Sequence, residues 1–185
     1  MGGISRLALA SVVALYSNYH PGAKGQWTET VLHAFSGKDG VTPIGTLVFD
    51  GAGNLYGATS YIGEQYGMVF KLSPGAEWTL TILHVFSGNT AEYPTGVTLD
   101  TAGNLYGTTA ESNTGDGIVY ELTAVSGGQS NFEILHIFNS SGKYGDSPQA
   151  APILDAAGNL YGTTFWGGNL NNCANGCGVV FKITR

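Results

Sequence analysis

One eight-residue phrase occurs three times in this chain, and its regular return constrains the fold more than any other feature. The copies occupy residues 50–57, 100–107 and 155–162 and share the pattern Asp-x-Ala-Gly-Asn-Leu-Tyr-Gly. Their central glycines, Gly53, Gly103 and Gly158, stand 50 and 55 residues apart. A Leu-His-x-Phe phrase precedes each copy, and a Gly-x-Val-aromatic phrase follows it. A fixed period of this length indicates one supersecondary unit per repeat.

Each period contains segments with the composition of β-strands, separated by turns rich in Gly and Pro. The first period predicts strands at residues 44–49, 54–59, 67–72 and 77–86. The later periods predict them at residues 96–100, 104–109, 117–122, 132–138, 150–155, 159–165 and 178–184. Residues 27–35 are β-branched and aromatic and add a strand at the beginning. Four short antiparallel strands in about fifty residues are typical of a β-propeller blade.

The predicted strands begin with the fourth strand of one blade and end with the third strand of another. We therefore expect an all-β fold of three tandem blade-like repeats, at approximately residues 27–75, 76–127 and 128–185. A closed propeller has about four to eight blades, so three need completion. Either the chain is part of a longer protein, or residues 27–35 complete the last blade of another copy. Exchange of this kind predicts a closed six-bladed dimer or an open filament.

The composition narrows the class of protein and its partners. Of 185 residues, 43% are hydrophobic, 11% are charged and 29 are Gly, which suits a turn-rich all-β fold with a buried core. The formal net charge is −6, with only seven Lys and Arg residues. So few cations leave no basic stripe for a phosphate backbone, and we do not expect nucleic acid as a partner.

Residues 1–26 lie outside the repeats and outside the expected domain at residues 27–185. They contain Arg6, an apolar run at residues 7–16 and a polar, turn-prone stretch, which is the layout of a secretory signal. The run of about ten residues is too short to span a bilayer, so no membrane span is predicted. An ordered first strand and an incomplete gene start remain the alternatives.

The repeated phrases together resemble the GloVer tandem-repeat family of bacterial secreted and surface proteins, over residues 31–183. The resemblance implies propeller-like β structure without an assigned catalytic activity, and it transfers no catalytic residues. Family members are usually longer arrays, often with a C-terminal anchoring segment, whereas this chain has three copies. This departure favours assembly between chains or a truncated array.

Two sets of ionisable residues recur with the repeats: Asp50, Asp100 and Asp155, and His33, His84 and His136. Each Asp precedes a Gly between two strands, so we expect it to cap the turn. Calcium would need several converging oxygen ligands, and each repeat offers a lone carboxylate here. The His residues fall on the fourth, outermost strand of each repeat, where they diverge, so packing is expected and a metal site is not. No cofactor is predicted.

Tyr56, Tyr106 and Tyr161 alternate with Leu along the second strand of each repeat. Their repetition favours packing between blades, with a hydrogen-bond partner for each hydroxyl. The alternative is a repeated carbohydrate platform, because flat aromatic rings beside the amides of the neighbouring Asn residues suit sugars.

The loop at residues 165–177 is the most distinctive segment between the repeated phrases. It contains four candidate ligand-binding residues: Trp166, Asn169, Asn171 and Asn172. Variable loops on a rigid scaffold often carry function, although extra length can also be a tolerated insertion. Cys173 and Cys177, the only cysteines, are expected to form a disulfide in an oxidising compartment. A zinc site would need further Cys or His, and a redox dithiol is normally Cys-x-x-Cys on a helix.

Three functions follow, in order of preference. The first is a non-catalytic extracellular repeat protein, structural or adhesive, that assembles with copies of itself through its terminal strands. The second is a lectin-like, carbohydrate-binding propeller. The third is a propeller glycosidase or lyase, for which the loops offer only Glu64, Glu111 and Asp116 as acids. No catalytic residues are assigned, because the sequence contains no nucleophile elbow, no zinc-protease motif and no phosphate-binding loop.

Overall fold

The computed structural model describes residues 27–62, 66–88, 91–112, 116–124, 130–139, 144–171 and 173–185. Within these ranges the chain is all β, with twelve strands and no helix. Leu32–Arg185 form one compact unit, and residues 27–31 are the described part of a separate N-terminal unit.

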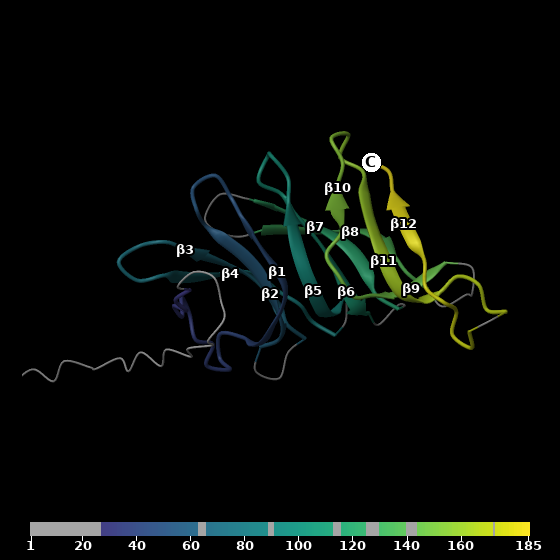
Figure 1. The fold of residues 1–185 in the computed structure, drawn as a ribbon, viewed down its shortest axis with the longest axis horizontal. Helices are drawn as coiled ribbons and strands as arrows, with labels where there is room; N and C mark the ends of the chain where they lie inside the picture. The colour runs from purple at the N-terminus through teal and green to yellow at the C-terminus, as the bar shows by residue number, and fades with distance from the viewer. Residues whose placement is uncertain are drawn as a thin grey trace, which may run out of the picture. The chain divides into compact units, whose positions relative to one another are not determined.

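Three antiparallel sheets follow one another along the chain (Figure 1). The first has the order β1 (Val41–Phe49), β2 (Leu55–Tyr61), β3 (Met68–Ser73) and β4 (Thr79–Val85). The second repeats it with β5 (Glu92–Leu99), β6 (Leu105–Glu111), β7 (Ile118–Ala124) and β8 (Ser130–Ile137). In the third, β9 (Gly145–Pro148) and β10 (Ile153–Leu154) both pair with β11 (Leu160–Gly167), which also pairs with β12 (Val180–Ile183). The expected four-stranded antiparallel sheets are therefore confirmed twice in full and once in part.

A glycine lies beneath an aromatic ring at the same place in every sheet. Gly57 is paired with Phe70, Gly107 with Tyr120 and Gly162 with Phe181 across neighbouring strands. A Cβ at any of these glycines would collide with the ring of its partner. The last Gly of the repeated phrase is thus required by the aromatic residue of the next strand.

The core lies between successive sheets. One cluster joins Val69 of β3 and Phe86, just after β4, to Val97, Ile118 and Tyr120 of the second sheet. A second cluster joins the second sheet to the third in the same way, and a third lies on the other face of the first sheet. The closing Phe of each Leu-His-x-Phe phrase contacts the aromatic ring of the next sheet edge-on. The ring centroids are 5.3 Å apart for Phe35–Phe70, 5.2 Å for Phe86–Tyr120 and 5.1 Å for Phe138–Phe181.

The predicted strand at residues 27–35 is wrong, because the chain has no strand there. A strand exists only through its hydrogen-bonded neighbour, and the described residues supply none for this segment. The predicted strand at residues 150–155 is also displaced, since β9 begins earlier and β10 covers only two residues. Pro152 lies in the gap between them, and it has no N–H to donate to a ladder.

Candidate functional site

Each repeated phrase folds into the same turn around its aspartate. One oxygen of Asp50, Oδ1, accepts hydrogen bonds from the backbone N–H groups of Ala52 and Asn54, both at 2.9 Å. The other, Oδ2, accepts from the Asn54 side-chain amide at 2.7 Å and from the Tyr56 hydroxyl at 3.0 Å. Asp100 and Asp155 repeat these four contacts. The prediction that these residues cap turns is confirmed.

The donors around each aspartate stabilise its ionised form. The Asn54 side chain, helped by backbone donors and Tyr56, lowers the pKa of Asp50 to about 2 against the opposing effect of desolvation. The Asn159 side chain does the same for Asp155, whose pKa is also about 2. Desolvation, together with Asp50, raises the pKa of Tyr56 to about 12. Neither group of this pair exchanges protons near neutral pH, so this turn is unsuited to acid–base chemistry.

The hydroxyl groups of Tyr56, Tyr106 and Tyr161 each have a hydrogen-bond partner, as the sequence predicted. The sequence did not predict which residue that partner is. The partner is the aspartate six residues earlier, and Tyr106 also donates to Glu121 at 2.8 Å. Tyr106 is buried between the second and third sheets, and Tyr56 packs against the cluster between the first and second. The Lys182 ammonium lies over the Tyr161 ring, 5.4 Å from its centroid. The constant spacing of Asp, Asn and Tyr in the three phrases is the sequence feature that could have identified the aspartate as this partner.

The repeated histidines pack separately against aromatic rings. His84 stacks on Phe132 with centroids 4.5 Å apart, and burial lowers the pKa of its imidazole. His136 lies edge-on to Phe138, and burial lowers its pKa as well. His33 is 3.0 Å from a carboxylate oxygen of Asp39. Among the described residues, no three His, Cys, Asp or Glu side chains gather in a way that could hold a metal ion.

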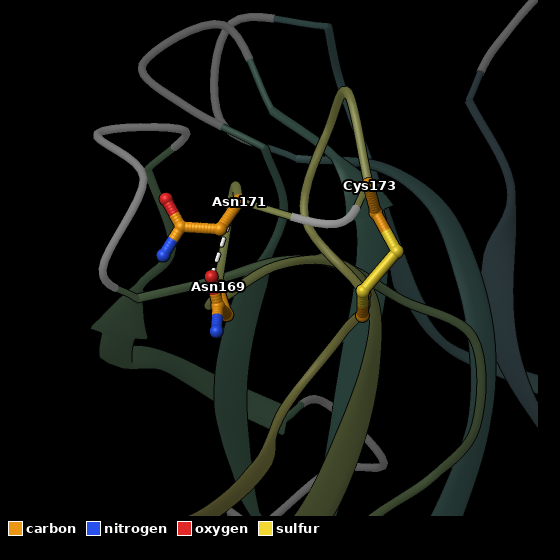
Figure 2. Close-up of a disulfide and its surroundings, with 4 residues drawn as sticks. Asn169, Asn171 and Cys173 are labelled. Atoms are coloured by element: carbon orange, nitrogen blue, oxygen red, sulfur yellow. Dashed lines mark hydrogen bonds between the residues drawn. A yellow bond between two sulfur atoms is a disulfide. The ribbon is translucent and has the colours of Figure 1, made fainter.

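The distinctive loop is closed by the predicted disulfide between Cys173 and Cys177. Figure 2 shows the disulfide on one side of the loop and Asn169 with Asn171 on the other. The backbone N–H of Asn171 donates to the Asn169 side-chain oxygen at 2.8 Å, which closes a small local turn. Asn172 lies outside the described residues.

Trp166 and the repeat tyrosines do not form one site. Phe165 and Trp166 pack edge-to-face with centroids 4.5 Å apart, and both are exposed. Tyr161 lies on the same strand, but five positions away, which is about 17 Å and on the opposite face of the sheet. The loop candidates and the tyrosine candidates are therefore separate surfaces.

The two described candidate acids each have an acidic neighbour. Glu111, at the end of β6, pairs across the ladder with Glu92. The pKa of Glu92 is raised by desolvation and by this neighbour. The charge on Asp116 acts on Asp146, whose pKa desolvation also raises. Glu64 lies outside the described residues.

The edge of β12 is the place where the third sheet differs most from the other two. Val180 is 82% exposed, whereas the equivalent Val69 and Val119 are both fully buried at 0%. In the first two sheets a fourth strand pairs with this edge, and His84 and His136 stand opposite those valines. Beside β12 there is instead an open groove of about 490 Å³, whose lining includes Phe138, Tyr144 and Phe181.

The outer face of the first sheet is covered only in part, because Phe35 packs on Phe70 while Leu47 stays exposed. Leu47 is 52% exposed, although its equivalent in the second sheet, Val97, is 1% exposed within the cluster between sheets. An added Cβ at Gly57 would meet both Leu47 and Phe70, so these two side chains share a face. The described unit thus has two unfilled apolar surfaces, one on its first sheet and one on its last.

The sequence model of the Gloeobacter/Verrucomicrobia repeat matches residues 16–185. This chain belongs to the GloVer repeat family. A comparison with curated proteins finds no match. The three GloVer copies correspond to the three sheets, since each contains one Asp-x-Ala-Gly-Asn-Leu-Tyr-Gly turn followed by one Gly-aromatic pair.

Two properties bear on where this GloVer chain resides. No helix among the described residues is long and apolar enough to cross a membrane. The Cys173–Cys177 disulfide is compatible with an extracellular, oxidising environment.

Proposed function

We propose that this GloVer protein is a non-catalytic, extracellular structural protein that assembles with copies of itself by strand complementation. Its three sheets would be blades of a β-propeller, and among the described residues no strand pairs with the outer edge of β12 in the last of them. The observation that carries the proposal is the open edge of β12, where Val180 is exposed although both of its equivalents are buried. An unpaired edge of this kind is a template for another strand.

The N-terminal segment has the sequence of the missing strand. Residues 27–35 read Trp-Thr-Glu-Thr-Val-Leu-His-Ala-Phe, and residues 78–86, which include β4, read Trp-Thr-Leu-Thr-Ile-Leu-His-Val-Phe. In the first sheet Val69 pairs with His84 and Phe70 with Ile82. The same register places His33 of one copy opposite Val180 of another, and Val31 opposite Phe181.

The closing end of the segment is already in its repeat position. Phe35 packs against Phe70 as Phe86 packs against Tyr120. In the complete sheets the closing Phe also donates its backbone N–H to the glycine that precedes the third strand, from Phe86 to Gly67 and from Phe138 to Gly117, both at 2.9 Å. The equivalent bond in an assembly joins Phe35 of one copy to Gly178 of the next.

The remainder of the segment has apolar side chains that this chain leaves uncovered. Trp27 is 89% exposed and Val31 is 70% exposed, whereas the equivalent Trp78 packs against a core cluster. Pairing with β12 would remove part of this apolar surface from water. Each Å² that is buried stabilises the assembly by about 25 cal/mol. Two copies exchanging strands give six blades, and an exchange that does not close gives a filament.

Light scattering of the purified chain, with negative-stain images of the same sample, tests the proposal. We expect a discrete dimer or filaments for the wild type and the mass of one chain for Thr30→Pro or Val31→Pro. The backbone N–H groups of successive residues in a strand point alternately toward and away from the partner strand. One of these two substitutions therefore removes a hydrogen bond to β12. Ala156→Pro is the control, because it places proline at the favoured second position of an exposed turn. A wild-type protein that stays monomeric at high concentration would refute strand complementation.

Carbohydrate binding is the second candidate, and the exposed Phe165–Trp166 pair favours it. Its rings lie next to a loop with side-chain amides at Asn169 and Asn171, a combination that suits a sugar ring. A glycan array with the wild type, Trp166→Ala and the control Ile82→Ala tests it. Binding that is lost only with Trp166→Ala supports the site, and the absence of binding by the wild type removes this candidate.

A further inference from the structure

The two interfaces between sheets contain the same main-chain hydrogen bond. The N–H of Tyr93 in β5 donates to the carbonyl oxygen of Tyr66 at 3.2 Å, and the N–H of Ser147 in β9 donates to that of Asp116 at 2.7 Å. Each donor belongs to the first strand of one sheet, and each acceptor lies two residues before the third strand of the sheet before it. Tyr93 and Ser147 both have a φ of 57°, which is uncommon for residues other than glycine.

A proline–glycine contact accompanies each of these bonds. A Cβ at Gly67 would meet Pro94, and a Cβ at Gly117 would meet Pro148. The proline follows the donor residue and the glycine follows the acceptor residue. Two bonded residues and the pair beside them therefore form a docking element that the chain uses twice.

The first sheet contains the donor half of a third docking element. Thr42 has the same φ of 57° as Tyr93 and Ser147, although a β-branched residue strongly disfavours this conformation. Pro43 follows it and is exposed, whereas Pro94 and Pro148 are buried. Leu47 completes the surface at the position of the buried Val97.

The third sheet contains the acceptor half. Cys177 and Gly178 stand where Tyr66 and Gly67 stand in the first sheet, immediately before the third strand. Ile153 and Val180 are exposed at the positions of Val48 and Val69, which pack into the cluster between the first two sheets. None of these residues of the third sheet is charged.

We propose that the first sheet of a second copy packs face-on against the third sheet of this chain and forms the third instance of the internal interface. This inference rests on the proposed assembly through the chain ends and adds a sheet-to-sheet surface to the exchanged strand. The N–H of Thr42 in one copy donates to the carbonyl oxygen of Cys177 in the other, and Pro43 packs on Gly178. Leu47 of the first copy then covers Ile153 and Val180 of the second, while Phe70 stays beneath Phe35 of its own chain.

The occupant is a second copy because the two exposed faces are the complementary halves of an interface, not two copies of one half. A face that matched itself would give a two-fold symmetric dimer with the same residues on both sides. Here the exposed Leu47 belongs to the first sheet, and the exposed Ile153 and Val180 belong to the third. The contact is therefore heterologous and runs head to tail.

Complementation between blocked chains tests this interface. Leu47→Asp blocks the first sheet, and Ile153→Asp blocks the third, at positions already exposed in the single chain. We expect each variant alone to have the mass of one chain by light scattering. Mixed in equal amounts, they should form pairs with the mass of two chains, because the mixture retains one intact interface. Ile82→Asp, on the outer strand β4, is the control and should assemble like the wild type.

The outcomes separate this inference from the proposed function. Circular dichroism and urea denaturation first establish that each variant is folded. A monomeric wild type would refute both proposals. Loss of assembly in Thr30→Pro or Val31→Pro, with both aspartate variants still assembled, would leave strand complementation standing and overturn the sheet-to-sheet contact. Monomeric aspartate variants that do not pair on mixing would overturn the head-to-tail arrangement.

Discussion

A single carboxylate organises each repeated turn. Asp50 receives four hydrogen bonds from residues within six positions of itself, so the Asp, Asn and Tyr of the phrase are explained by one small network. The same network at Asp100 and Asp155 accounts for the repetition without any catalytic requirement. At the residue scale, the signature of this chain is a device for making a turn.

Acid should weaken the fold through these aspartates. The folded-state pKa of Asp50 and of Asp155 is about 2, below the ordinary value of 3.8. Their contribution to stability is therefore complete above about pH 4 and is lost as the pH falls through 2. We expect the free energy of unfolding, measured by urea denaturation, to fall between pH 4 and pH 2. Asp50→Asn and Asp155→Asn should each make this fall shallower.

Asp146 supplies the control of opposite sign. Desolvation and Asp116 raise its pKa, so its ionisation destabilises the fold as the pH rises. Asp146→Asn should raise stability at neutral pH and leave a steeper loss in acid. An acid transition that is unchanged in Asp50→Asn would contradict the assignment of its pKa.

The Tyr120→Phe substitution should make the folded protein more stable. Its hydroxyl is buried and has no hydrogen-bond partner among the described residues, and Phe70 and Phe181 stand at the equivalent positions. Removing an unsatisfied buried hydroxyl should stabilise the fold by about 1 kcal/mol. Tyr106→Phe is the matched control, because it breaks bonds to Asp100 and Glu121 and should cost about 1–3 kcal/mol. Urea denaturation measures both, and equal effects of one sign would contradict the distinction.

At the scale of the element, each sheet is built on a glycine covered by an aromatic ring. This pairing fixes which residue of the third strand lies opposite the end of the repeated phrase. The register then shifts at the same place in both complete sheets, after Val69 and after Val119, so the fourth strands are equivalent as well. The repetition in sequence is therefore a repetition of register and not only of composition.

Gly107→Ala should destabilise the second sheet. The added Cβ would collide with the ring of Tyr120 and approach the carbonyl oxygen of Gly96. Overpacking of this kind typically costs about 1–3 kcal/mol. Gly51→Ala is the control, since nothing lies within 4 Å of its Cβ position, and it should change stability by less than about 0.5 kcal/mol.

A double variant identifies the atoms responsible. Tyr120→Phe removes the oxygen that lies closest to the new methyl group, so Gly107→Ala should cost less in that background than alone. The difference is measured as the interaction term of a double-mutant cycle by urea denaturation. Strict additivity would show that the ring oxygen is not what the methyl group meets.

The sequence predicted local structure better than it predicted termini. The strands of the first two sheets, the aspartate turns and the disulfide all depend on residues close to one another, and the phrases expose them by repetition. The failure at residues 27–35 has the opposite cause, because these residues have the composition of β4 but lack a neighbour in the described chain. Pattern alone could not show that Thr42 adopts the backbone conformation of Tyr93, since the residue types at these positions differ.

At the scale of the whole molecule, the fold is a series of interfaces more than a series of sheets. Two of the core clusters take residues from two successive sheets, so packing between sheets completes the core. In the described chain, the first sheet leaves Leu47 exposed and the third leaves Ile153 and Val180 exposed. The loop at residues 165–177 adjoins the exposed face of the third sheet, because its last residue, Cys177, directly precedes Gly178 of the acceptor half.

Reduction of the disulfide should therefore weaken assembly more than it weakens the fold. The bridge between Cys173 and Cys177 closes a loop of a few residues, so its loss should lower the free energy of unfolding by no more than about 2 kcal/mol. The carbonyl of Cys177 stands where Tyr66 and Asp116 accept a hydrogen bond from the next sheet, and the bridge restrains its position. We expect the mass measured by light scattering to fall toward one chain after reduction, and likewise in a Cys173→Ser, Cys177→Ser double variant. Thermal unfolding should still show a cooperative transition in both cases. An unchanged mass, with complete reduction verified by mass spectrometry, would contradict a role for the bridge in holding the acceptor face.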